Sequence, residues 1–182
     1  MRYNAPTTVV MHRTTVLTDS EIRRLLLCNP PLLEDMVDAE IQIQPCGVDL
    51  TVRRVSSYIS SGTVDFDNSH RTLSVTEPWD WNGGHVFLPA GAYHIVYNEK
   101  VNLPRDVMAL AYPRSSLLRC GVTVHTAVWD PGYSGRGEAL LIVYNQAGFR
   151  LERWARVVQL VFTRLGNIAT EGYRGRFHGE NE

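Results

Sequence analysis

Short apolar segments separated by glycine, proline and asparagine dominate the hydrophobic pattern of the chain. Apolar and polar residues alternate over residues 41–44 and again over residues 48–52, as they do in strands that bury one face. Similar segments recur at roughly regular spacing, at residues 55–60, 63–66, 72–75, 85–88, 93–97, 108–111, 138–144 and 157–162. Because many short strands bury their apolar faces by closing or stacking sheets, we expect a mainly β fold, an antiparallel β-barrel or a jelly-roll-like sandwich.

One helix is expected before this series of strands. Thr18 followed by Glu21 has the form of a capping box, in which each residue binds the other's backbone N–H. Ile22 and Leu25 then recur at helical spacing, and the prolines at positions 30 and 31 would end the helix. The pattern predicts a short amphipathic helix that serves packing.

The length of 182 residues favours a single domain over residues 1–182. Residues 1–16 form an extended lead-in, and the glycine-rich, polar residues 170–182 form a C-terminal tail. The chain shows neither an internal repeat nor an interdomain linker. These features predict one compact unit with short extensions at both ends.

Charge and cysteine content narrow the classes of partner and compartment. The net charge of −1 gives no bulk field that would favour nucleic acid or an anionic membrane, and no apolar run approaches the roughly 20 residues of a membrane span. The three cysteines show no metal-ligand or disulfide spacing, which is typical of a reducing compartment. We therefore expect a cytoplasmic protein with no nucleic-acid or membrane partner.

Candidate chemistry is concentrated between residues 112 and 145. Arg114, Ser115, Ser116 and Arg119 form a compact polar cluster, and guanidinium and hydroxyl groups suit phosphate oxygens. Asp130 follows in an Asp-Pro-Gly-Tyr-Ser-Gly turn between apolar segments, a position where a scaffold presents functional groups. Each half alone is an ordinary polar turn. Together they predict a site for a phosphate-bearing substrate, although the chain lacks the GxxxxGK[ST] and GxGxxG nucleotide motifs.

The order of motifs resembles the dUTPase/dCTP deaminase superfamily, most closely its archaeal-type dUTPases. The resemblance runs from about Leu17 to the C-terminus and is most specific in the second and third of five motifs. The five motifs are GVDL at residues 47–50, PRSSL at 113–117, VWDPGYSG at 128–135, RWARVVQL at 153–160 and GYRGRF at 172–177. Membership would imply a dUTPase-like antiparallel β fold and a homotrimer with shared active sites.

The superfamily contains two chemistries, which a glutamate after the third motif distinguishes. In deaminating members this glutamate shuttles protons, but here its position falls on Ile142 or Leu140, depending on the direction of the count. Glu138 is the nearest acid and is displaced from both, and Val128 stands where deaminases carry an arginine. The resemblance thus predicts hydrolysis of dUTP to dUMP and pyrophosphate. A dCTP deaminase, alone or joined to dUTPase activity, and a non-catalytic nucleotide-binding regulatory trimer remain alternatives.

The resemblance also assigns roles at the reacting centre. Asp130 would orient or deprotonate the water that attacks the α-phosphorus, and Tyr133 would pack on deoxyribose and exclude a 2′-hydroxyl. The backbone of residues 124–133 would recognise uracil. The phosphate oxygens would be held by a set of polar side chains, namely Arg114, Ser115, Ser116 and Gln159, with Arg119 as a further candidate. These are expectations from the family and not from spacing.

The tail and the metal complete the implied site. The tail would be mobile and close over the substrate, with Phe177 lying over the base and Arg174 or Arg176 reaching the γ-phosphate; a disordered terminus is the alternative. Magnesium would bridge the phosphates, and Asp49 would act on it indirectly, through metal-bound water or the subunit interface. From the residues alone, Asp49 falls inside an alternating apolar segment and could face inward; the alternatives are that it points to solvent or pairs with Arg53.

Overall fold

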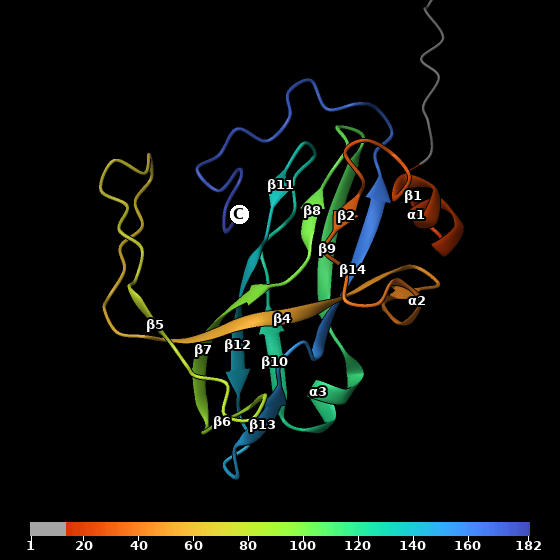
Figure 1. The fold of residues 1–182 in the computed structure, drawn as a ribbon. Coiled ribbons are helices and arrows are strands. Elements are labelled where there is room, and N and C mark those ends of the chain that lie inside the picture. The colour runs from red at the N-terminus through yellow and green to blue at the C-terminus, as the bar shows by residue number, and fades with distance from the viewer. Residues whose placement is uncertain (1–13) are drawn as a thin grey trace, which may run out of the picture.

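The structure is a computed structural model that describes residues 14–182, so most of the predicted lead-in lies outside the described residues. Its fold confirms the predicted mainly β class, with strands that run antiparallel in a curled sheet (Figure 1). The strands are β1 Thr15–Val16, β2 Leu33–Glu34, β3 Ile43–Gln44, β4 Gly47–Tyr58, β5 Thr76–Pro78, β6 His85–Leu88, β7 Gly91–Tyr97, β8 Lys100–Asn102, β9 Val107–Pro113, β10 Val122–His125, β11 Ser134–Gly135, β12 Glu138–Val143, β13 Phe149–Glu152 and β14 Arg156–Arg164. The helices are α1 Asp19–Leu25, α2 Ala39–Gln42 and α3 Ser115–Arg119.

Strand β4 is the centre of the architecture. It pairs with β14 on one side and β7 on the other, within a nine-stranded sheet of order β1-β14-β4-β7-β12-β10; β3 and β5 also pair with β4, and β9 with β14. Smaller sheets of order β11-β8-β2 and β13-β6 complete the fold. Every residue from Gly47 to Val52 is buried, so this half of β4 has both faces covered although its sequence alternates. Functional groups placed here are held by the core.

The predicted helix is confirmed as α1. Thr18 Oγ1 accepts from the Glu21 N–H at 3.4 Å, and the Thr18 N–H donates to Glu21 Oε2 at 3.0 Å, so both bonds of the capping box are made. Ile22 is fully buried and anchors the helix on the core. Among the described residues, no helix is long and apolar enough to cross a membrane.

Two local predictions were wrong. Ile41 and Gln42 belong to α2 and not to a strand, because Asp38 caps the helix by accepting from the N–H groups of Glu40 and Ile41. Residues 63–66 and 72–75 meet in a single bridge between Thr63 and Thr72, within an arm that extends from the body of the molecule (Figure 1). The polar cluster that begins at Arg114 continues into α3, with Arg114 as the N-cap residue.

Candidate functional site

The predicted site residues fall into two groups on the described chain. One group lies around Asp130 and Tyr133 in a pocket that the tail covers. The other lies around Arg114 and Gln159, where β4, β14 and β9 run side by side. No residue lines both pockets.

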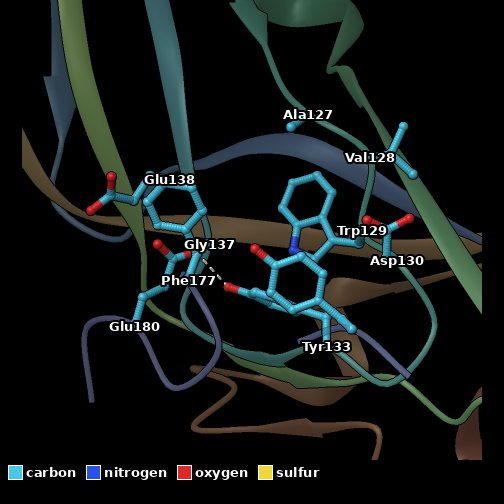
Figure 2. Close-up of a pocket in the computed structure, with 10 residues that line it drawn as sticks. Ala127, Val128, Trp129, Asp130, Tyr133, Gly137, Glu138, Phe177 and Glu180 are labelled. Carbon is cyan, nitrogen blue, oxygen red and sulfur yellow. Dashed lines mark hydrogen bonds between the residues drawn. The ribbon is translucent and has the colours of Figure 1, made fainter. Parts of the chain in front are cut away.

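The loop that carries Asp130 connects β10 to β11 and is fixed by its neighbour Trp129. The Trp129 N–H and C=O both bond to Ala109 of β9 at 3.0 Å, and the indole is buried against Tyr97 with ring centroids 6.0 Å apart. A Cβ on Gly137 would lie 2.8 Å from the indole, so glycine is required for this packing. The Asp130 side chain is exposed at the rim of the pocket, where a water or substrate can reach it (Figure 2).

Tyr133 and the tail form the floor and lid of this pocket. The Tyr133 ring is buried, and its hydroxyl donates to Glu180 Oε1 at 2.7 Å (Figure 2). Burial, reinforced by this contact, raises the pKa of Tyr133, and burial also raises the pKa of Glu180. Gly132 at φ +81° lets the tail approach closely, since the neighbouring Tyr173 N–H donates to the Pro131 carbonyl at 2.7 Å. Phe177 lines the same pocket.

The tail leaves little room in the Asp130 pocket. The volume of this pocket is about 110 Å³, whereas pockets for small molecules usually measure about 300–1,000 Å³. Gly179 N–H donates to the Ser134 carbonyl at 2.7 Å, and the Arg136 N–H donates to the Glu180 carbonyl at 3.0 Å. The tail therefore docks on the chain's own third-motif loop, and a nucleotide would have to move Glu180 to enter.

Glu138 also lines the Asp130 pocket, which its displaced sequence position did not predict. Its Oε2 lies 2.8 Å from His94 Nε2, and its Oε1 accepts from Asn181 Nδ2 at 2.9 Å. Burial alone would raise the pKa of Glu138, but the bonds from His94 and Asn181 outweigh burial and lower it. The carboxylate points away from Trp129 and Asp130 in Figure 2. Glu138 is thus an ionised anchor for the tail in this arrangement.

The second group is centred on Asp49. In the register of the sheet, Asp49 of β4 faces Gln159 of β14, and Gln159 faces Tyr112 of β9. The Arg114 Nε lies 2.9 Å from Asp49 Oδ2, and an Arg156 guanidinium nitrogen donates to the same oxygen at 3.1 Å. Asp49 does not pair with Arg53 or face solvent, and both of these alternatives were wrong.

Burial and charge act on Asp49 in opposite directions. Burial raises the pKa of Asp49, and the positive charges of Arg114 and Arg156 oppose the rise. The carboxylate in turn fixes the Arg114 guanidinium, whose side chain stays 29% exposed at a pocket of about 250 Å³. Arg114, Ser115 and Gln159 line this pocket together, which suits phosphate oxygens.

The remaining predicted residues are less involved within one chain. Ser116 and Arg119 lie on α3 outside the Arg114 pocket, and an Arg119 guanidinium nitrogen donates to the Ser115 carbonyl at 3.1 Å. Arg174 and Arg176 are exposed on the tail; an Arg174 nitrogen lies 3.7 Å from Glu171 Oε2. Both tail arginines are free to reach a ligand.

Strand geometry separates the two groups. Trp129, beside Asp130, pairs with Ala109, and Arg114 lies five residues further along the same chain segment. At about 3.4 Å per residue, Arg114 lies about 17 Å along the chain from Ala109, the residue that holds Trp129. A single chain therefore does not bring Asp130 to the Arg114 cluster.

Comparison with known proteins identifies the family. A family model described as dCTP deaminase-like matches residues 16–165. The chain belongs to the dCTP deaminase-like family. It is 48% identical to a probable deoxyuridine 5'-triphosphate nucleotidohydrolase of Methanosarcina mazei, over 91% of this chain and 98% of that protein. A protein of the same description from Archaeoglobus fulgidus is 49% identical over 91% of this chain and 97% of its own length.

A solved member of the dCTP deaminase-like fold supports the architecture. The 2'-deoxycytidine 5'-triphosphate deaminase from Agrobacterium tumefaciens superimposes with a TM-score of 0.63 and 21% identity, over 83% of this chain and 48% of that chain. At this identity the likeness concerns the fold. Motif matching did not assign Arg156 or Glu180, although Arg156 lies within the fourth motif and contacts Asp49, and Glu180 accepts a hydrogen bond from Tyr133.

Proposed function

We propose that this protein is a dUTP diphosphatase, which hydrolyses dUTP to dUMP and pyrophosphate. The observation that carries the proposal is the presence of an exposed carboxylate, Asp130, and a buried tyrosine, Tyr133, in one pocket. The position of the deaminase glutamate, counted along the sequence, falls on Ile142 or Leu140. Ile142 and Leu140 cannot exchange protons with a base. The high identity to proteins described as deoxyuridine 5'-triphosphate nucleotidohydrolases supports the same reading.

In the proposed reaction, Asp130 holds a water in line with the α-phosphorus and accepts its proton. The water oxygen forms a bond to the α-phosphorus, the bond to the bridging oxygen of the β-phosphate breaks, and pyrophosphate leaves. Because Asp130 is exposed, it can bind that water directly. Positioning and charge neutralisation supply most of the catalysis in such transfers.

Recognition of the nucleoside falls to the loop and to Tyr133. Within the described residues, the backbone groups of Ala127 and Val128 make no hydrogen bond, and both residues line the pocket. They are available to the edge of a uracil ring. Tyr133 offers its ring face to deoxyribose, where a 2′-hydroxyl would be crowded.

The phosphates are proposed to bind at the Arg114 cluster. Arg114, Ser115, Ser116 and Gln159 would donate to phosphate oxygens, with Arg119 at the far end of α3 as a further donor. From the tail, Phe177 would cover the base, and Arg174 or Arg176 would reach the γ-phosphate.

A partner subunit would supply the half of the site that one chain lacks. Since Arg114 lies about 17 Å along the chain from the Ala109–Trp129 pair that holds the Asp130 loop, a triphosphate on Arg114 of one chain would meet Asp130 of another. This arrangement fits a homotrimer with shared active sites, because a ring with three junctions forms three equivalent sites.

Magnesium is proposed to enter with the triphosphate. The described residues contain no group of three or more His, Cys, Asp and Glu side chains placed to hold a metal ion. Asp49 Oδ2 is taken by two arginines, so contact of Asp49 with magnesium would pass through water. Magnesium typically binds substrate phosphates with few protein ligands and neutralises their charge.

We also propose a cytoplasmic location, because the three cysteines lack the spacing of a metal site or a disulfide framework.

A second candidate function is dCTP deamination, because Glu138 lines the Asp130 pocket. Its carboxylate would have to leave His94 and Asn181 to reach a base. Product analysis separates the candidates: purified protein is incubated with magnesium and either dUTP or dCTP, and the nucleotides are separated by ion-exchange chromatography. Release of dUMP and pyrophosphate from dUTP with dCTP intact is expected. Conversion of dCTP would favour the deaminase, and no turnover of either would favour a non-catalytic binding trimer.

A further inference from the structure

A second concave site lies on the other side of the tail from Asp130. It has a volume of about 530 Å³ and is lined by three arginines, two tryptophans and the end of the tail. The lining residues are Arg53, Arg54, Arg153, Trp79, Trp81, Pro78, Val96, Asn181 and Glu182. This volume falls within the usual range for small-molecule sites, about 300–1,000 Å³.

A β-bulge brings two of the arginines to one side. Successive residues of a regular strand point to opposite faces, yet Arg53 and Arg54 are both exposed and both line this pocket. The register of β4 against β7 shifts between Val52 and Arg54, which is where a bulge inserts an extra residue. Bulges of this kind redirect side chains and occur often beside functional sites.

A strained turn brings the third arginine. Trp154 follows Arg153 and adopts φ +67°, a conformation that is rare for a bulky residue. The turn is bonded to the bulge, since Trp154 N–H donates to the Val52 carbonyl and Val52 N–H donates to the Ala155 carbonyl, both at 3.0 Å. The bulge in β4 and the turn at Trp154 are distant in sequence but are bonded to each other. Together they bring three guanidinium groups to one pocket.

These guanidinium groups have few partners of their own. Among the described residues, no carboxylate lies within ion-pair distance of Arg53, Arg54 or Arg153. Arg54 donates to Asn181 Oδ1 at 3.2 Å, and Arg153 stacks on the Trp154 ring at 4.5 Å. The carboxylate of Glu182, which also lines the pocket, is neutralised by Lys100 Nζ at 2.6 Å. The pocket is therefore cationic in a chain whose net charge is −1.

We propose that this pocket binds a second, phosphate-bearing ligand of nucleotide size, separate from the substrate at Asp130. Its phosphates would take the unpaired donors of Arg53, Arg54 and Arg153, since guanidinium groups bind phosphate bidentately. A planar base would lie against the half-buried indoles of Trp79 and Trp81.

The tail links this pocket to the Asp130 pocket. Asn181 accepts from Arg54 on one side and donates to Glu138 on the other. A phosphate that takes the Arg54 donors competes with Asn181, so the bound ligand loosens the same tail that covers Asp130. Binding at the two pockets is coupled through that contact, and the coupling acts equally in both directions.

The test is to measure equilibrium binding of inorganic tripolyphosphate and of ATP to the protein by calorimetry and by tryptophan fluorescence. The double variant Arg54→Ala/Arg153→Ala is expected to bind both probes at least about tenfold more weakly than the unmodified protein. Trp81→Leu is expected to weaken the binding of ATP but not the binding of tripolyphosphate. The matched control Arg24→Ala/Arg150→Ala removes two exposed arginines that do not line the pocket and should bind as the unmodified protein does.

Two results would overturn the proposal. One is that neither probe binds the unmodified protein at millimolar concentration. The other is that Arg114→Ala abolishes binding while Arg54→Ala/Arg153→Ala does not, since the phosphate would then occupy the Arg114 cluster. Neither result depends on dUTP turnover. Failure of this proposal would therefore not affect the proposed hydrolysis of dUTP, which the product analysis tests separately.

Discussion

Asp130 and Asp49, the acids at the centres of the two groups, are held in different ways. Asp49 lies in the interior of β4, 2% exposed, with Gln159 opposite it and two guanidinium groups on one oxygen. Asp130 lies exposed on a loop that Trp129 holds against β9, at the rim of a pocket that the glycine-rich tail covers. The first is a rigid charge network within the sheet, and the second is a pocket that has to open. The comparison suggests that phosphate binding is preorganised, whereas access to the reacting centre depends on the tail.

Removing the Asp130 charge should have the largest effect. We expect Asp130→Asn to lower kcat for dUTP by about 10²–10⁴, because a positioned base contributes on that order. The Kd of a non-hydrolysable dUTP analogue should change by less than about tenfold. Asp80→Asn, which alters an exposed carboxylate outside both groups, is the matched control. Unchanged turnover in Asp130→Asn would remove Asp130 from the chemistry.

Loss of the Asp49 charge should act through Arg114. Asp49→Asn keeps the shape but gives up the ion pairs to Arg114 and Arg156, so the guanidinium that faces the phosphates is no longer fixed. We expect kcat/KM to fall by about 10–100-fold, measured by steady-state kinetics. Asp106→Asn, which breaks the Asp106–Arg164 pair away from both groups, should retain activity. Equal losses in the two variants would indicate a general stability effect.

The tail contact should depend on pH. The pKa of Glu180 is raised above its usual 4.5 when the tail is docked, so docking favours the protonated acid. The contribution of Glu180 to docking is fully present below about pH 4.5 and is lost as pH rises through the raised value. Glu180→Gln should remove this dependence and increase protection of the Gly179 and Arg136 amides about three- to tenfold at pH 8, measured by hydrogen exchange. If amide protection depended on pH in the same way in the unmodified protein and in Glu180→Gln, the proposed role of Glu180 in tail docking would be contradicted.

Glu138→Gln should have the smallest effect on hydrolysis. Glutamine keeps an oxygen for Asn181, and Glu138 is directed to His94 rather than to Asp130. We expect dUTP turnover within about threefold of the unmodified protein, since no proton transfer is assigned to this residue. A loss comparable to that of Asp130→Asn would show that Glu138 takes part in the reaction.

Much of the fold could be predicted from the sequence because local signals agreed with tertiary structure. The capping box of Thr18 and Glu21 is satisfied within four residues, and the alternating segments became strands. The strand prediction was wrong at residues 41–42, because Asp38 caps a helix there and the Gln42 side-chain amide donates to the buried Glu99 carboxylate at 2.7 Å. That contact spans 57 positions, so no local pattern could have announced it.

The site shows the same division. Motif matching located Arg114, Asp130, Tyr133 and Phe177, each of which lines one of the two pockets. It could not place Arg156 on Asp49 or Glu180 on Tyr133, since both contacts join segments that meet through the sheet and the tail. The separation of Asp130 from Arg114 likewise follows from the β9 register and not from their proximity in sequence.

The most direct test of the account is complementation between two inactive chains. Asp130→Asn and Arg114→Ala are co-expressed with different tags, and mixed assemblies are purified and assayed for dUMP release. If each site draws Asp130 and Arg114 from different subunits, about a third of the sites in the purified mixed trimers would be intact, although each variant alone is inactive. Mixed assemblies that form but remain as inactive as the parents would contradict a shared site and return both groups to one chain.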